Sequence, residues 1–143
     1  MDLKRSASAR WTGDLKTGRG TISTESKTLS DAQYSFKTRF EQGTGTNPEE
    51  LIAAAHAGCF SMALSAQLGN AGMTPESIDT TAVTKMEKLD AGWTVTQIDL
   101  TTKVRIPGGD KAKFDKAAAE AKAGCPISRL LNAKITLNAR LEA

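Results

Sequence analysis

The first forty residues alternate between apolar and polar positions in the way that short strands do. Residues 9–11 and 21–23 flank a glycine-rich turn at residues 17–20, and this pattern predicts an antiparallel hairpin. From residue 34 to residue 40, aromatic and threonine positions alternate with serine, lysine and arginine. A period of two predicts a further strand, with Arg39 on its polar face.

A long apolar segment follows a glycine-rich loop. Asn47 in the N-cap position, Pro48 as the first helical residue and Glu50 in the capping-box position predict the start of a helix. Glycines and an asparagine at residues 69–72 predict its end. Between residues 51 and 64 only one histidine and one serine are polar. A helix that is apolar nearly all round belongs in a core, so we expect this helix to be buried.

The remaining sequence predicts strands and helices in alternation. Two threonine- and valine-rich runs are joined by a hairpin signal, an alanine-rich helix and a shorter helix follow, and an alternating segment predicts a last strand. These elements cover residues 78–88, 93–104, 111–123, 126–131 and 135–141. The order βββ-α-ββ-α-α-β predicts an α+β fold with largely antiparallel sheets, formed by a single domain over residues 1–143.

Composition narrows the possible functions. No uninterrupted apolar run reaches the ~18 residues that a membrane-spanning helix needs, so the sequence predicts no such helix. The first twenty residues are polar, which predicts no secretory signal and a cytoplasmic location. A net charge of +3, with two tryptophans, one tyrosine and four phenylalanines, argues against a nucleic-acid-binding protein.

Two cysteines, Cys59 and Cys125, are the candidates for chemistry. In a reducing compartment a cysteine pair is typical of catalysis, redox sensing or metal binding, although a buried cysteine also serves as a small hydrophobic residue. Within the apolar helix, the Cys59 thiol is expected to be dehydrated, with a raised pKa, unless a cation approaches it. His56, three residues away, either pairs with this thiol or is a satisfied core residue.

Cys125 lies between a glycine and a proline, where the N-cap of a new helix is expected. Backbone N–H groups at such a position favour a thiolate, although the residue could also simply belong to a turn. Cys59, His56 and Cys125 could together supply three metal ligands. However, the sequence has neither a CxxC pair nor a second histidine, so no metal site is predicted.

The segment NPEELIAAAHAGCFSMAL at residues 47–64 resembles the central helix of the OsmC/Ohr family. This family comprises the osmotically inducible protein C and organic hydroperoxide resistance proteins. The similarity extends to Gly-Cys-Pro at residues 124–126, Thr-Arg-Phe at 38–40 and Trp-Thr-Gly-Asp at 11–14, and the arginine at 39 points to the OsmC branch. The resemblance implies antiparallel sheets packed around a long buried central helix, in an intertwined homodimer with active sites near the interface.

The resemblance also implies a thiol-dependent peroxidase that acts on organic hydroperoxides and, less efficiently, on hydrogen peroxide. Cys59 would be the peroxidatic nucleophile and Cys125 the resolving thiol. Arg39 would activate the thiolate and stabilise the departing oxygen, and Glu49 would orient Arg39. No metal or organic cofactor is implied, and the electrons would come from an external dithiol, which in some members of the family is a dihydrolipoyl group.

Helix geometry constrains this assignment. Glu49 and Cys59 are ten residues apart, which corresponds to ~15 Å along a helix and to directions roughly 80° apart. Three arrangements could bring the groups together: Arg39 bridges the gap, the helix is bent, or Arg39 and Glu49 come from a second chain, which we favour. Taken alone, Arg39 could be a solvated residue and Glu49 a favourable charge at a helix start. The alternative function is a small-molecule or lipid-binding protein with a non-catalytic Cys59.

Overall fold

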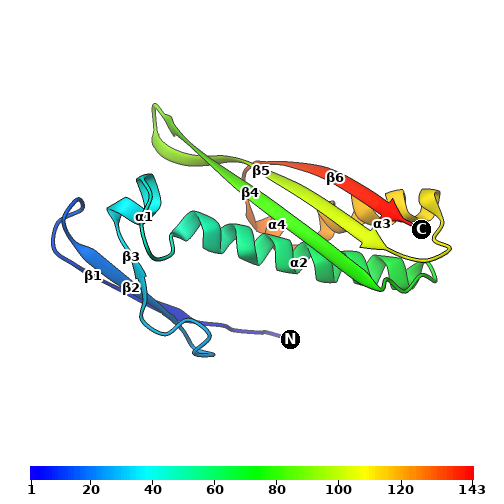
Figure 1. Ribbon diagram of the computed structural model, residues 1–143, viewed down its shortest axis with the longest axis horizontal. Helices are drawn as coiled ribbons and strands as arrows, with labels where there is room; N and C mark the ends of the chain where they lie inside the picture. The colour runs from blue at the N-terminus through cyan, green and yellow to red at the C-terminus, as the bar shows by residue number, and fades with distance from the viewer. The chain divides into compact units, whose positions relative to one another are not determined.

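The computed structural model describes all 143 residues, which form two compact units (Figure 1). The first unit covers Met1–Leu51 and the second covers Ile52–Ala143. The prediction that residues 1–143 form one domain stays a prediction.

The first unit is built on a three-stranded antiparallel sheet in the order β1-β2-β3. Strands β1 (Ala7–Thr12) and β2 (Arg19–Thr24) form the predicted hairpin, and β3 (Ala32–Tyr34) pairs with the other side of β2. Gly20 lies opposite Trp11 in β1 and opposite Tyr34 in β3. Because a Cβ atom at Gly20 would collide with both aromatic rings, only glycine lets the two side chains meet across β2.

The strand predicted over residues 34–40 is wrong beyond Tyr34, because a helix, α1 (Phe36–Phe40), replaces it. Ser35 is the N-cap of this helix, and its side chain accepts a hydrogen bond from the Thr38 backbone N–H at 3.2 Å. In return, the Ser35 backbone N–H donates to the Thr38 hydroxyl at 2.8 Å. This reciprocal capping favours a helix despite the alternation, so Arg39 lies in a helical turn and not on a strand.

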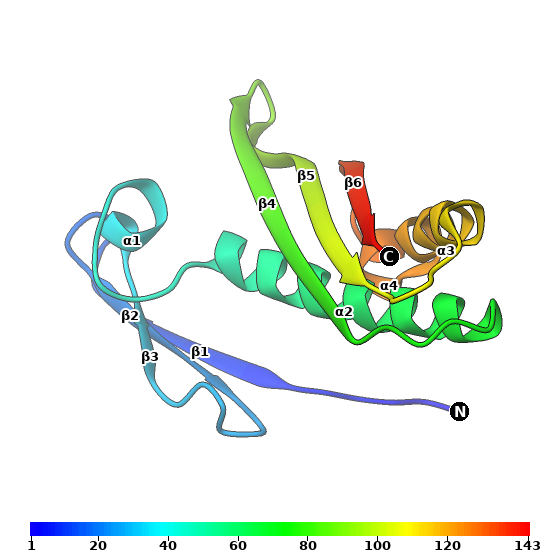
Figure 2. The same ribbon diagram turned by 45° about the vertical axis from the view of Figure 1, so that its right-hand side comes forward.

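The second unit contains a mixed sheet in the order β4-β5-β6 (Figures 1 and 2). Strands β4 (Ser77–Leu89) and β5 (Gly92–Arg105) form the predicted antiparallel hairpin. Strand β6 (Lys134–Glu142) is parallel to β5, so the prediction of antiparallel sheets is wrong here. The chain reaches β6 through α3 (Lys111–Gly124) and α4 (Pro126–Leu130), and a helical crossover of this kind returns the chain in a parallel direction.

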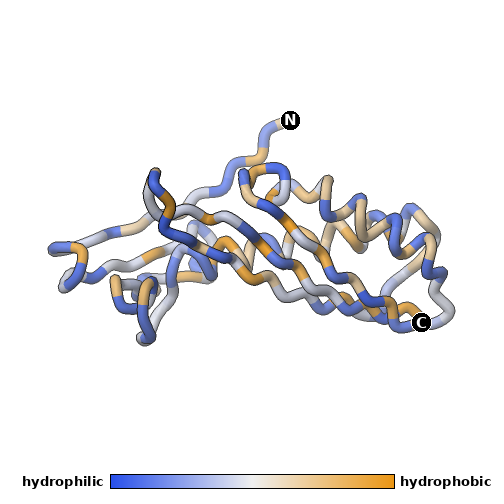
Figure 3. The backbone as a smooth tube through the Cα atoms, turned by 90° about the horizontal axis from the view of Figure 1, so that it is seen from above, coloured by the Kyte–Doolittle hydropathy of each residue, from blue (hydrophilic) through white to orange (hydrophobic).

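Helices α2 (Pro48–Asn70) and α3 contribute to the core of this unit, together with the alternating apolar positions of the sheet (Figure 3). Within the chain, α2 buries a single stripe with a spacing of four residues: His56, Phe60, Leu64 and Leu68. The prediction of a helix buried all round is therefore wrong for one chain. Between residues 54 and 69 the exposed positions, all small except Met62, form what we call the small-residue face of α2: Ala54, Ala55, Gly58, Met62, Ser65, Ala66 and Gly69.

By length and composition, α2 is long and apolar enough to cross a membrane. The prediction that the sequence contains no membrane-spanning helix was too strong, because it rested only on the length of uninterrupted apolar runs. Alanines on both sides of the few polar residues keep the average hydropathy of α2 high. The core helices of globular proteins share these properties, so composition alone does not assign α2 to a bilayer.

Candidate active site

The two cysteines lie in contact within the second unit. Cys59 projects from α2, and Cys125 occupies the junction where α3 ends and α4 begins, as predicted. Both are free thiols, and the Cys125 thiol donates a hydrogen bond to Cys59 Sγ at 2.9 Å. Because an S–S bond is about 2.05 Å long, the two sulfurs need to approach by less than about 1 Å to form a disulfide.

The surroundings of Cys59 favour its protonated form. Burial raises the pKa of the Cys59 thiol most, and the adjacent Cys125 thiol raises it further, through the hydrogen bond between the two thiols and, to a smaller extent, through repulsion between two charged sulfurs. A hydrogen bond from the backbone of Ile127 in α4 lowers the pKa of Cys59. None of these influences is a positive charge. As the sequence indicated, Cys59 still needs a nearby cation to lower its pKa.

The start of α4 acts on a different cysteine from the one predicted. Cys125 is the N-cap of α4 but makes no capping hydrogen bond through its side chain. The backbone of Ile127, in the first turn of α4, instead bonds to Cys59. No hydrogen bond in the structure therefore supports the predicted Cys125 thiolate. The backbone hydrogen bond from the start of α4 goes to Cys59 instead.

His56 pairs with a serine and not with the thiol. Its ring is fully buried, and Nε2 lies 2.7 Å from the hydroxyl of Ser128 in α4. Nδ1 has no hydrogen-bond partner. Of the two alternatives for His56, the structure supports a core residue, although only one of its two ring nitrogens is satisfied.

The buried histidine predicts a loss of stability in acid. Burial lowers the pKa of His56 below its ordinary value of 6.5, because the charged imidazolium is desolvated. Below about pH 6.5 the unfolded chain therefore binds a proton that the folded chain does not, and the free energy of unfolding falls until the lowered pKa is reached. Urea unfolding of the wild type and His56→Gln at about pH 7.5 and about pH 5.5 measures this. An equal pH dependence in both proteins would contradict it.

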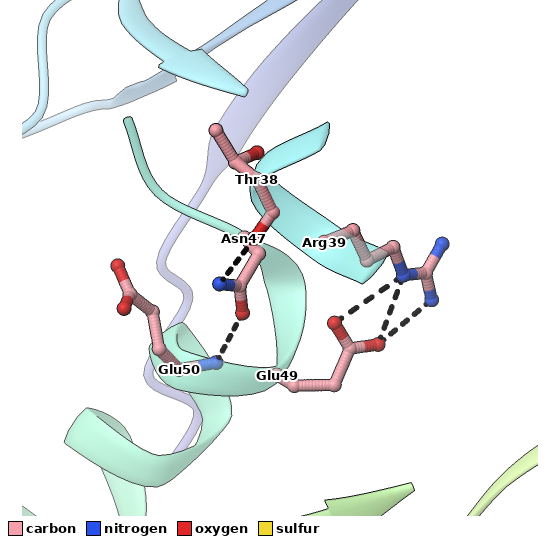
Figure 4. Close-up of polar contacts among 5 residues, drawn as sticks. All are labelled: Thr38, Arg39, Asn47, Glu49 and Glu50. Atoms are coloured by element: carbon pink, nitrogen blue, oxygen red, sulfur yellow. Dashed lines mark hydrogen bonds and ion pairs between the residues drawn. The ribbon is translucent and has the colours of Figure 1, made fainter. Parts of the chain in front are cut away.

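Arg39 and Glu49 form an ion pair within the first unit (Figure 4). Nη2 of Arg39 donates to Glu49 Oε1 at 2.8 Å, and Nε donates to the same oxygen at 3.1 Å. The side chain of Glu49 is only 13% exposed and that of Arg39 is 39% exposed. The guanidinium carbon also lies 5.5 Å from the centre of the Phe40 ring, so the arginine is held from two sides.

Asn47 fixes the two elements that carry this ion pair. Its Oδ1 accepts a hydrogen bond from the Glu50 backbone N–H at 2.8 Å, which confirms the predicted N-cap of α2. Its Nδ2 donates to the Thr38 carbonyl at 3.0 Å and ties the start of α2 to α1 (Figure 4). The Glu50 carboxylate accepts from the Thr46 hydroxyl at 2.7 Å. One asparagine thus holds Arg39 and Glu49 within reach of each other.

An apolar cavity of about 230 Å³ adjoins Arg39, and it was not predicted from the sequence. The Phe36 and Phe40 rings are 4.8 Å apart, and the Trp11 and Tyr34 rings are 5.4 Å apart. The complete lining consists of Trp11, Leu15, Tyr34, Ser35, Phe36, Arg39 and Phe40. The signal in the sequence was the gathering of three of the seven aromatic residues, at positions 34, 36 and 40, around Arg39.

The predicted site residues therefore form two pairs, one in each unit. Arg39 contacts Glu49 in the first unit, and Cys59 contacts Cys125 in the second. Nowhere in the chain do three or more histidine, cysteine, aspartate or glutamate side chains gather as metal ligands would. The chemistry that the cysteine pair can perform is reversible oxidation through sulfenic acid and disulfide.

The sequence is closely similar to two curated bacterial proteins. A family model described as OsmC-like protein matches residues 41–140. The chain is 54% identical over 143 residues, covering all of both chains, to Peroxiredoxin OsmC of Escherichia coli (strain K12). The protein of the same name from Shigella flexneri matches with the same identity and coverage.

Solved structures share the fold at low sequence identity. An OsmC-like protein from Mycoplasma pneumoniae matches with a TM-score of 0.78 at 15% identity, over 100% of both chains. An OsmC-like protein of unknown function from Vibrio cholerae O1 biovar eltor matches with a TM-score of 0.77 at 18% identity, over 96% of this chain and 99% of that one. These two structures confirm the α+β architecture.

Proposed function

The chain belongs to the OsmC-like protein family, and from this premise we propose that it is a thiol-dependent peroxidase of organic hydroperoxides. The observation that carries the proposal is the contact of two free thiols, Cys59 and Cys125, at 2.9 Å. The name peroxiredoxin given to a relative of 54% identity over the full length supports it. Hydrogen peroxide would be a poorer substrate.

The proposed cycle balances with an external dithiol as reductant. The Cys59 thiolate attacks one peroxide oxygen, so that an S–O bond forms, the O–O bond breaks, and the departing alkoxide takes a proton to leave as an alcohol. The Cys125 thiol then attacks the sulfur of the Cys59 sulfenic acid, an S–S bond forms, and water leaves. The dithiol, for example on a dihydrolipoyl protein, returns both cysteines to thiols and is itself oxidised. In this cycle the two cysteines need no metal or organic cofactor. We place the cycle in the reducing cytoplasm.

Arg39 is proposed to supply the positive charge that Cys59 lacks. A guanidinium stays charged at any physiological pH, so it would lower the pKa of the thiol and stabilise the charge developing on the departing oxygen. The ion pair to Glu49 uses Nε and Nη2, which leaves Nη1 for a peroxide oxygen. Glu49 would thus orient the guanidinium without occupying all of its donors.

We infer that Arg39 and Glu49 act on Cys59 of a second copy of the chain. Ten residues of one continuous helix separate Glu49 from Cys59, or about 15 Å along the axis, so the carboxylate cannot reach the thiol of its own helix. The small-residue face of α2 supports an intertwined homodimer. A Cβ atom at Gly58 or Gly69 would meet nothing within 4 Å, so each position leaves room for the close approach of another helix.

The aromatic cavity beside Arg39 supports organic hydroperoxides as the preferred class. Its lining is mostly apolar, so it would take up the hydrocarbon part of a substrate while the guanidinium faces the peroxide oxygens. The same cavity is what a small-molecule or lipid-binding protein would need. That alternative has no use for two thiols in contact, and an activity assay separates the two functions.

The test is a panel of hydrogen peroxide, cumene hydroperoxide and a fatty-acid hydroperoxide, assayed with dihydrolipoate and the purified protein. We expect turnover of all three, with the highest kcat/KM for the organic peroxides. Peroxide that disappears no faster than with dihydrolipoate alone would leave the binding function as the better explanation.

Leu15→Ser tests the role of the cavity. Leu15 is exposed and lines the cavity, so the variant is expected to fold normally. Losing one apolar wall should lower kcat/KM for cumene hydroperoxide about 5- to 10-fold and leave hydrogen peroxide unchanged. Leu3→Ser, which changes an exposed leucine outside the cavity, is the matched control. An equal loss for both peroxides would show that the cavity does not select the substrate.

A further inference from the structure

Two side-by-side contacts join α2 to the start of α4. Cys59 contacts Cys125, and His56 contacts Ser128. On α2, His56 and Cys59 are three residues apart, and at the start of α4 their partners Ser128 and Cys125 are also three residues apart. Because residues three apart share a face of a helix, both contacts connect the same two surfaces and fix both the distance and the orientation of α4.

The His56–Ser128 contact is a main anchor of α4. This helix has only five residues, too few to be stable without contacts to its surroundings. Ser128 is the only buried residue within it, while residues 126, 129 and 130 are exposed. The Nε2 of His56 lies 2.7 Å from the Ser128 hydroxyl, and because His56 is fully buried and Ser128 is only 9% exposed, water has little access to replace either partner.

We propose that His56 and Ser128 are positioning residues for the disulfide-forming step, an inference that rests on the proposed peroxidase cycle. The Cys59 sulfenic acid has two fates. Attack by Cys125 forms the S–S bond and releases water, whereas a second peroxide molecule transfers another oxygen and produces sulfinic acid. Holding α4 against α2 keeps the Cys125 sulfur next to Cys59, so that disulfide formation is faster than oxidation to sulfinic acid.

The His56–Ser128 contact does not bond to the nucleophile itself. His56 directs Nε2 to Ser128, and Nδ1 has no partner, so neither nitrogen is bonded to the Cys59 sulfur. Removing the Ser128 hydroxyl should therefore slow the second step far more than the first oxidation of Cys59, which α4 influences only through the Ile127 backbone bond. A residue that merely stabilised the fold would not divide the two steps in this way.

Ser128→Ala is the decisive variant. The reduced full-length protein is mixed with cumene hydroperoxide without reductant, and sulfenic acid, disulfide and sulfinic acid are followed over time by mass spectrometry. We expect disulfide formation to slow about 10- to 100-fold, with more sulfinic acid and a much smaller change in the first step. Ser128→Thr, which keeps the hydroxyl, should restore the wild-type rate.

Ser61→Ala is the matched control, and His56 offers a second pair of variants. The Ser61 hydroxyl lies on α2 and is part-buried, and it shares hydrogen bonds with the Ala57 carbonyl and the Thr80 hydroxyl and not with α4. His56→Leu removes the contact from the other side. His56→Gln, whose amide can take the place of Nε2, should preserve disulfide formation. The His56 pair decides the question if Ser128→Ala does not fold.

An equilibrium measurement separates this inference from the peroxidase proposal. The protein is incubated in mixtures of lipoate and dihydrolipoate without peroxide, and the fraction of Cys59–Cys125 disulfide is determined. We expect the Ser128→Ala disulfide to be reduced about tenfold more readily than the wild-type disulfide. A wild type that forms the disulfide but consumes no peroxide refutes the peroxidase function and leaves this comparison intact. Ser128→Ala that matches Ser61→Ala in both rate and equilibrium overturns the positioning role.

Discussion

Replacing Cys59 with serine is expected to reduce peroxide consumption to the uncatalysed rate, a loss of at least about 10³-fold in kcat/KM. The serine hydroxyl is far less acidic than a thiol and cannot form a sulfenic acid, so the cycle has no first step. The measurement is consumption of cumene hydroperoxide with dihydrolipoate in excess. The substitution exchanges one atom, so the partly buried position should tolerate it and the variant should fold.

Cys125→Ser is the control for this result, because it removes the other thiol of the same pair. The first oxidation of Cys59 should proceed at least as fast as in the wild type for one equivalent of peroxide, because the Cys125 thiol raises the pKa of Cys59. Without its partner, Cys59 should then accumulate as sulfinic acid when peroxide is in excess. Retained turnover in Cys59→Ser would exclude the mechanism, whereas equal losses of the first step in both variants would mean that the cysteines were assigned to the wrong roles.

Arg39→Ala is expected to lower the rate of Cys59 oxidation about 10²- to 10³-fold. Cys59 has a raised pKa and no positive charge among the groups that shift it, so removing the only proposed source of charge should leave the thiol protonated. Arg39→Lys keeps the charge but loses the two-point contact with Glu49, so it should recover only part of the rate. The second-order rate of sulfenic acid formation measures both effects.

Mixing Arg39→Ala chains with Cys59→Ser chains tests whether the arginine comes from a second copy. If it does, each mixed dimer holds one site with both Cys59 and Arg39, and random association gives about a quarter of the wild-type activity. If Arg39 serves Cys59 of its own chain, no mixed dimer contains a complete site and the mixture stays inactive. Each variant assayed alone provides the baseline.

Local sequence signals predicted most of the fold, and their failures have physical causes. The turn glycines and the Asn47–Pro48 helix start placed the hairpins and α2 correctly. The alternation between Tyr34 and Phe40 predicted a strand, but the reciprocal hydrogen bonds of Ser35 and Thr38 stabilise a helix there. A period of two describes side chains only, whereas capping satisfies backbone groups that a short strand would leave unpaired.

Contacts between distant parts of the chain were the hardest features to predict from the sequence. The two cysteines could be singled out because their type is rare and reactive, but nothing in the sequence pairs His56 with Ser128, 72 residues away. Strand β6 alternates as a strand should, yet alternation does not indicate direction, and its parallel pairing follows from the crossover through α3 and α4. The cavity beside Arg39 likewise depends on Gly20, which lets Trp11 and Tyr34 meet.

The small-residue face of α2 links the folding of this protein to its abundance. With that face covered by a second copy, as proposed, part of the apolar surface of α2 leaves water only on association. Mass action then makes the folded fraction depend on how many chains are present, so that dilution lowers the temperature of unfolding. A cell that makes more of the protein would obtain chains that are individually more stable, and a cell that makes little would lose a larger share to unfolding and degradation.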